Sequence, residues 1–130
     1  MSKMKVVLYC RSATFQQLAY QKVQLMRYAE ENGCEVVAIV TEKRNGVSAR
    51  RWKLNLAMRL AQKYSAAILI RDISRVSRVT AVAIRILERL QQRRLKLYTT
   101  IEGMEKDAVE MYLLQSVMAD MVSLPNMSTV

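Results

Sequence analysis

Short apolar segments alternate with amphipathic ones along most of this chain, and that alternation constrains its fold more than any other feature. Four short segments are apolar and β-branched, as buried strands are: 5–10, 34–40, 66–70 and 95–101. Four longer ones carry apolar side chains at helical spacing: 15–32, 52–64, 79–94 and about 104–122. Strands that alternate with helices predict a mainly parallel sheet with right-handed crossovers. We therefore expect one α/β domain over residues 1–130, a three-layer sandwich with its core at 4–101 and a long C-terminal helix.

The expected order of the four strands across the sheet is 2-1-3-4. Parallel sheets bind ligands beyond the carboxyl ends of their strands, at the point where the strand order reverses. In this order the reversal lies between the first strand and the third, which run into Arg11 and Arg71. The loops that carry Arg11–Thr14 and Arg71–Arg78 are therefore expected to meet in one crevice.

The net charge points to an anionic partner. The chain has 21 basic and 11 acidic residues, a formal charge of +10. Residues 1–100 alone carry 20 basic and 6 acidic residues, a net charge of +14, whereas residues 101–130 are acidic. This imbalance fits either a basic soluble surface or a nucleic-acid partner, DNA or RNA. With one Trp and one Phe, base stacking is poorly supported, so contact with backbone phosphates is the better expectation.

Several residue types that other functions need are missing. There is no histidine, and the two cysteines, Cys10 and Cys34, form no CxxC pair, so we expect no metal and no cofactor. No apolar run approaches the roughly 20 residues that span a bilayer, and the N-terminus does not resemble a secretory signal. The expected compartment is the cytoplasm, with no membrane partner. Any catalysis has to rely on arginine, lysine, hydroxyl or carboxylate groups.

Arginines are the side chains that converge on the expected crevice. Those on or near its loops are Arg11, Arg50, Arg51, Arg71, Arg75 and Arg78. Guanidinium groups suit phosphate because they stay charged and present several fixed donors. Arginines around a hydroxyl could support phosphoryl transfer without a metal, the hydroxyl attacking while the cations neutralise the phosphate oxygens. The alternative is a rim of ordinary solvated arginines.

Four segments resemble the catalytic domain of the serine recombinases, the resolvase/invertase family. That family opens with Y-x-R-V-S-T, which here reads Tyr9-Cys10-Arg11-Ser12-Ala13-Thr14, and the next helix carries a glutamine like Gln21. Its mobile loop has a glycine and then an arginine, matched in "NGVSARRWKL" by Gly46 and Arg51. Its D-R-L-S-R aligns with Ser74-Arg75-Val76-Ser77-Arg78. The resemblance runs from about residue 4 to about residue 122.

The resemblance implies a mechanism and partners. In this family a serine attacks a DNA phosphodiester, forms a 5′-phosphoserine linkage and leaves a free 3′-hydroxyl, and no metal takes part. By resemblance, Arg11, Arg51, Arg75 and Arg78 would bind the scissile phosphate and stabilise the transition state, and Gln21 would join them in contacting DNA. The helix at 104–122 would form a homodimer or a larger assembly.

Two departures from the family pattern leave the activity open. Ala13 occupies the nucleophile position, and Ser74 replaces the aligned acid, with Asp72 two residues upstream. Ser12 is one residue early, so strand alternation is expected to turn it away from the crevice. Three interpretations follow: a domain that holds phosphate without cleaving it, a recombinase that uses Ser12, or an ordinary loop.

The C-terminal segment supports a second class of function. An apolar stripe at helical spacing comprises Met111, Leu114, Met118, Met121 and Val122. It would either pack on the chain's own sheet or mediate self-association. Nothing in residues 1–130 resembles a helix-turn-helix or a zinc ribbon, so we expect no separate DNA-binding domain among them. A non-enzymatic module that pairs with an active recombinase is therefore the alternative to a recombinase.

Overall fold

The computed structural model describes residues 3–44, 52–77 and 79–114. Within these ranges strands and helices alternate in the following order: β1 (Met4–Ser12), α1 (Phe15–Glu31), β2 (Cys34–Lys43), α2 (Trp52–Tyr64), β3 (Ala67–Ile70), a 3-10 turn η1 (Ile73–Arg75), α3 (Thr80–Gln92) and β4 (Leu97–Thr99). The strands of the described chain form one sheet in the order β2-β1-β3-β4, and every neighbouring pair is parallel. The predicted α/β class and strand order are confirmed.

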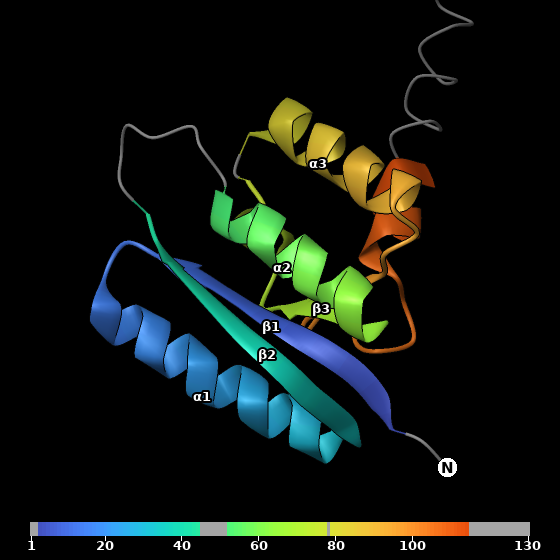
Figure 1. The fold of residues 1–130 in the computed structure, drawn as a ribbon. Helices are drawn as coiled ribbons and strands as arrows, with labels where there is room; N and C mark the ends of the chain where they lie inside the picture. The colour runs from blue at the N-terminus through green and yellow to red at the C-terminus, as the bar shows by residue number, and fades with distance from the viewer. Residues whose placement is uncertain (1–2, 45–51, 78, 115–130) are drawn as a thin grey trace, which may run out of the picture.

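Helices cover both faces of the sheet, so the domain has three layers. Helix α1 lies on one face, and α2 and α3 lie on the other (Figure 1). Side chains of β1 alternate between the two: Val7 and Tyr9 pack with α2 and α3, whereas Leu8 and Cys10 pack with α1. These four side chains are all 0% exposed. Burial on both faces explains why the strand reads as an unbroken apolar run.

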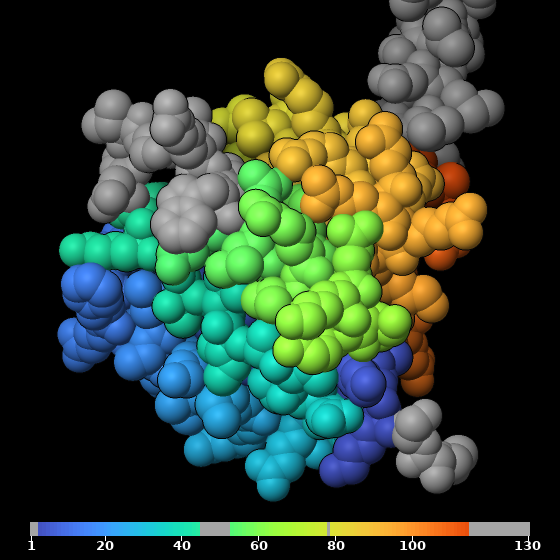
Figure 2. Space-filling model, viewed as in Figure 1, coloured from blue at the N-terminus to red at the C-terminus, as the bar shows by residue number. Residues whose placement is uncertain are grey.

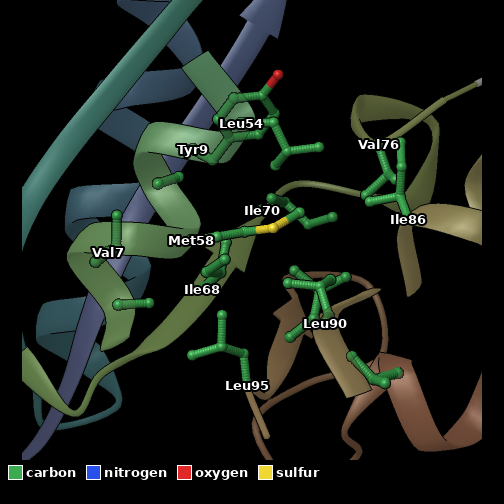
Figure 3. Close-up of a cluster of buried hydrophobic side chains, with 14 of the residues drawn as sticks. Val7, Tyr9, Leu54, Met58, Ile68, Ile70, Val76, Ile86, Leu90 and Leu95 are labelled. Carbon is green, nitrogen blue, oxygen red and sulfur yellow. The ribbon is translucent and has the colours of Figure 1, made fainter. Parts of the chain in front are cut away.

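The larger of the two cores lies between the sheet and the α2–α3 layer. Figure 3 shows Met58 of α2 and Leu90 of α3 directed toward Ile68 and Ile70 of β3. The smaller core lies under α1, where Leu18, Leu25 and Ala29 face the sheet. Because β1 and β3 are held from both sides, the loops that follow them start from fixed positions.

Two strands end at positions that the sequence did not indicate. Strand β2 continues to Lys43 because β1 pairs with it as far as Ser12, and the Arg44 amide then donates to the Ser12 carbonyl at 2.7 Å. Glu42, which lies beyond the predicted strand 34–40, therefore belongs to the sheet. Strand β4 is shorter than the predicted 95–101, since it pairs with β3 only over Leu97–Thr99.

The C-terminal helix begins later than expected. Residues 104–107 form turns, and the helix runs from 108 to 114, where the description of the chain ends. The reason is Asp107, whose carboxylate accepts hydrogen bonds from the Val109 amide at 3.1 Å and from the Leu97 amide of β4 at 3.0 Å. Such a side chain caps the first turn of a helix. Residues 115–122 lie outside the described ranges, so the length of this helix stays a prediction.

Candidate functional site

A cavity of about 350 Å³ lies beyond the carboxyl ends of β1 and β3. Its lining comes from the two predicted loops, from the first turns of α1 and from the residue after β2: Arg11, Ser12, Ala13, Gln17, Tyr20, Gln21, Arg44, Arg71, Ser74 and Arg75. Of the described residues, four arginines line it and no acidic side chain does. The cavity thus lies where the reversal of strand order predicted a crevice, and the charge of its lining suits an anion.

Two side chains hold the end of β1 in place at this cavity. The Arg75 guanidinium donates to the main-chain carbonyl of Arg11 at 3.0 Å, and the Gln21 amide nitrogen donates to the same oxygen at 3.1 Å. Gln21 is 2% exposed although it is polar. A carbonyl oxygen has two lone pairs, so this acceptor is fully used. Gln21 therefore acts on the strand end as well as lining the cavity.

Carboxylates lie behind two of the arginines. The Arg11 guanidinium Nε is 3.6 Å from Glu42 Oε1, and the Tyr9 hydroxyl donates to the same oxygen at 2.5 Å. Arg75 Nε is 3.7 Å from Asp72 Oδ2. Both arginine side chains are less than one-fifth exposed. These acids orient the guanidinium groups and offset part of their charge before any ligand binds.

Arg71 differs from these two arginines because its side chain is 46% exposed. Its Nε is 3.9 Å from Asp72 Oδ2, at the limit of an ion pair, so the pairing is weak in water. Arg71 is thus the lining arginine best able to turn toward an incoming phosphate without losing a buried contact.

Ser12 lies at the cavity, contrary to the expectation from strand alternation. It is 5% exposed, it is among the lining residues, and its hydroxyl donates to Gln17 Oε1 at 2.5 Å. Ser12 stays on the α1 side of the strand, as Leu8 and Cys10 do, so alternation itself holds. The expectation was wrong because the cavity extends over that side, where residues of α1 line it. An amide oxygen is a weak base, so this hydrogen bond does not activate the hydroxyl as a nucleophile.

The hydroxyls near Ala13 have other roles. Thr14 is the N-cap of α1, and its Oγ1 accepts a hydrogen bond from the main-chain amide of Gln17 at 3.1 Å. The Ser74 hydroxyl donates to Asp72 Oδ1, which also accepts from the Ser74 amide at 3.0 Å. Ala13 itself is exposed and lines the cavity, so the position that resemblance assigns to the nucleophile faces the site without a reactive atom.

Cys10 does not supply a nucleophile in its place. Burial raises the pKa of the Cys10 thiol to about 11, although the nearby charges of Lys22 and Arg75 act in the opposite direction. The reactive thiolate is therefore scarce at neutral pH. Within the described ranges, no group of three or more Cys, Asp or Glu side chains is arranged to hold a metal ion.

Some predicted residues fall outside this description, and other residues were missed. Arg51 and Arg78 belong to the parts of the chain that the structure does not describe. Arg44, Gln17 and Tyr20 line the cavity but were not predicted. The signal for Arg44 was its place at the end of β2, next to the strand at which the order reverses.

In the part of the chain that the structure describes, no helix is long and apolar enough to cross a membrane.

Comparison with known proteins identifies the family. The family model "Resolvase, N terminal domain" matches residues 6–124. Comparison with curated protein sequences gives no match. Among solved structures, a resolvase family site-specific recombinase from Streptococcus pneumoniae is 25% identical with a TM-score of 0.69, over 98% of this chain and 93% of that one.

Two further structures share the fold. The N-terminal catalytic domain of TP901-1 integrase is 17% identical with a TM-score of 0.70, over 97% of this chain and 99% of that one. The C-terminal catalytic domain of ISC1926 TnpA, an IS607-like serine recombinase, is 23% identical with a TM-score of 0.62, over 93% and 82%. With the family model covering nearly its whole length, this chain belongs to the resolvase family and corresponds to its N-terminal domain.

Proposed function

We propose that this domain binds a DNA phosphodiester in the cavity beyond β1 and β3 and holds it without cutting it. The observation that carries the proposal is the lining, in which arginines of the described chain surround Ala13 with no acidic side chain among them. Arg71 would donate to the phosphate oxygens first, because it is the more exposed. Arg11 and Arg75 would contribute charge from positions that their hydrogen bonds and neighbouring carboxylates fix.

Cleavage in this family requires a serine oxygen to attack phosphorus while the bond to the 3′ oxygen breaks. Ala13 has no such oxygen, and the Ser74 hydroxyl donates to Asp72. Membership of the resolvase family supports a role in, or descent from, DNA recombination. The proposed activity is therefore retention of a DNA backbone by a recombinase-type domain.

A working recombinase that uses Ser12 is the second candidate, and one observation favours it: the Ser12 side chain lies at the cavity. Its hydroxyl would first have to leave Gln17 and pass its proton to a stronger base. One experiment tests both candidates. The chain is incubated with duplex DNA, denatured, and run on a denaturing gel to detect a protein–DNA adduct.

We expect no adduct, together with duplex binding that weakens as salt is raised. An adduct that disappears in Ser12→Ala would overturn retention in favour of cleavage. Binding that is independent of salt would remove the phosphate-contact proposal itself. Arg71→Gln is the matched variant for the cavity, since it removes one exposed cation and is expected to lower the salt slope by about 1.

Self-association is the remaining part of the proposal. Leu114, at the end of the described helix, is 57% exposed, which leaves this member of the predicted apolar stripe accessible to a partner. A homodimer through residues 104–122 would pair two cavities, and it would let an inactive chain pair with an active relative. Sedimentation velocity of the wild type and of Leu114→Glu tests this: the variant is expected to be more monomeric.

A further inference from the structure

A second basic surface lies at the opposite end of the sheet from the cavity. An open groove of about 740 Å³ runs between the end of α2, the turn after α3 and the amino ends of the strands. Five cationic side chains of the described chain line it, and no acidic one does: Lys3, Lys5, Arg93, Arg94 and Lys96. Figure 2 shows the yellow-green end of α2 beside the dark-blue start of β1 and the orange chain that follows α3.

Within the described residues these cations form no ion pairs, although Glu35 of β2 lies opposite Lys5 in the strand register. None of the five has an ion-pair partner among the described residues, and of their side chains only that of Arg93 makes a hydrogen bond there, its Nη1 lying 3.7 Å from Met58 Sδ. Lys3, Lys5, Arg94 and Lys96 are exposed. Like charges gathered on one surface repel each other, which costs stability in the absence of a ligand.

Helix capping does not account for the cluster. Basic side chains often lie at helix C-termini, where they complement free carbonyls and the helix dipole. Here main-chain amides already serve those carbonyls: Ala66 donates to Ala61 at 2.8 Å, and Leu95 donates to Leu90 at 2.9 Å. Moreover, Lys3, Lys5 and Lys96 come from strand starts and not from helix ends.

We propose that this groove binds the phosphate backbone of duplex DNA, as a second contact surface separate from the cavity. Strand β1 has nine residues, so the two ends of the sheet are about 27 Å apart at roughly 3 Å per residue. A single phosphate group therefore cannot contact both the groove and the cavity. The cations fit a row of phosphates, whereas Tyr64 is the only lining aromatic side chain of the described chain that is exposed, so stacking with single-stranded bases is not supported.

An acidic surface of a second copy fits this groove less well. The described acidic residues after β4 are Glu102, Asp107, Glu105 and Glu110. Glu102 accepts hydrogen bonds from Thr99 and Tyr112, and Asp107 caps the last helix. Of these four, only Glu105 and Glu110 are exposed, which sets two negative charges against the five positive charges of the groove, and two chains of charge +10 repel each other.

The test compares two triple variants of the whole chain with equal loss of charge. The groove variant is Lys3→Gln, Lys5→Gln and Lys96→Gln, which spares both helix ends. The control is Arg59→Gln, Arg85→Gln and Lys106→Gln, all exposed and none lining the groove or the cavity. Affinity for a fluorescent duplex is measured by anisotropy over a range of salt concentrations.

The groove variant is expected to lower the slope of log affinity against log salt by about 3, and the control by less than about 1. Equal losses in both variants would overturn the proposal, because they would show that only net charge matters. A lost self-association in sedimentation, with the DNA slope unchanged, would also overturn it and would indicate a protein occupant.

A footprint on the wild type covers the case in which the groove variant folds poorly. Lysines are acetylated with and without duplex and quantified by mass spectrometry. Lys3, Lys5 and Lys96 are expected to be protected and Lys106 is not; absence of protection would contradict the groove. Arg71→Gln keeps the two proposals apart, because its effect on the salt slope reports on the cavity alone.

Discussion

Arg75 and Arg11 lie 64 positions apart, and one hydrogen bond joins the loops that carry them: Arg75 Nη1 donates to the Arg11 carbonyl at 3.0 Å. This bond connects η1, which follows β3, to the end of β1. Both segments contribute lining residues to the cavity. An arginine that the family resemblance assigns to phosphate therefore also has a structural role in this chain.

Replacing Arg75 by alanine is expected to lower both stability and DNA binding. The substitution removes one donor to a part-buried carbonyl and leaves Asp72 with only its weaker pairing to the exposed Arg71, so we expect a loss of about 1–3 kcal/mol in the free energy of unfolding. Urea denaturation measures the stability, and duplex anisotropy measures the binding. Arg71→Ala is the control: the exposed side chain should weaken binding while stability changes by less than about 0.5 kcal/mol. Equal stabilities for the two variants would contradict this difference.

Ala13→Ser is expected to produce a covalent adduct with duplex DNA. Ala13 is exposed and lines the cavity, so a hydroxyl there would face the arginines without a competing partner such as Gln17. Denaturing gels of the variant, with and without Ser12→Ala, measure the adduct. It should form in both backgrounds. An adduct that requires Ser12 would instead show that the reactive position has shifted by one residue.

The fold was predictable because both the cores and the connections leave patterns in the sequence. Runs such as 66–70 are buried on both faces and read as apolar, and helical spacing indicated α1, α2 and α3. The faces of the helices were less predictable. Val23 and Met26 of α1 are apolar yet 55% and 44% exposed, whereas the polar Gln21 is buried. Gln21 is buried because its amide serves the Arg11 carbonyl, a tertiary contact that periodicity does not record.

The location of the site was more predictable than the contacts between its residues. Strand order alone located the cavity between β1 and β3, and it identified Arg11 and Arg75. The contribution of β2 was missed, because the register that carries β2 to Lys43 depends on pairing with β1. That register brings Glu42 beside Arg11 and Arg44 into the lining. Alternation holds for Ser12, which lies on the α1 side with Leu8 and Cys10. The sequence did not indicate that side chains of α1 line the cavity on the same side.

Asp107→Ala is expected to destabilise the C-terminal helix and to detach it from β4. The Asp107 carboxylate accepts from two main-chain amides, Val109 in the helix and Leu97 in β4, and both would lose their partner. We expect a loss of about 1–3 kcal/mol, above the cost of a simple helix cap. Thermal unfolding measures it, and hydrogen exchange at Leu97 and Val109 localises it. Asp107→Asn keeps an acceptor and should lose less; an equal loss would indicate that charge matters more than the two bonds.

The stability of the domain is expected to fall as the pH rises from about 9 to 11. Burial raises the pKa of Cys10 from its ordinary value of 9.0 to about 11, so in this range the unfolded chain releases a proton that the folded chain retains. Stability decreases with pH wherever the unfolded state binds fewer protons, by about 3 kcal/mol for two pKa units. This contribution is complete below pH 9 and lost above 11.

Cys10→Ala separates the thiol from the other groups that titrate at alkaline pH. Burial also raises the pKa values of Cys34 and Tyr112, the latter to about 12, so part of the decline should remain in the variant. Cys10→Ala is expected to be less stable than the wild type at pH 8, because it opens a small cavity beneath α1, and to lose less stability between pH 9 and 11. Denaturant unfolding at each pH measures both effects, with Cys34→Ala as the matched control. Parallel profiles for the wild type and Cys10→Ala would show that the buried thiol does not set the alkaline limit, and that its neighbours Lys22 and Arg75 hold the pKa near its ordinary value.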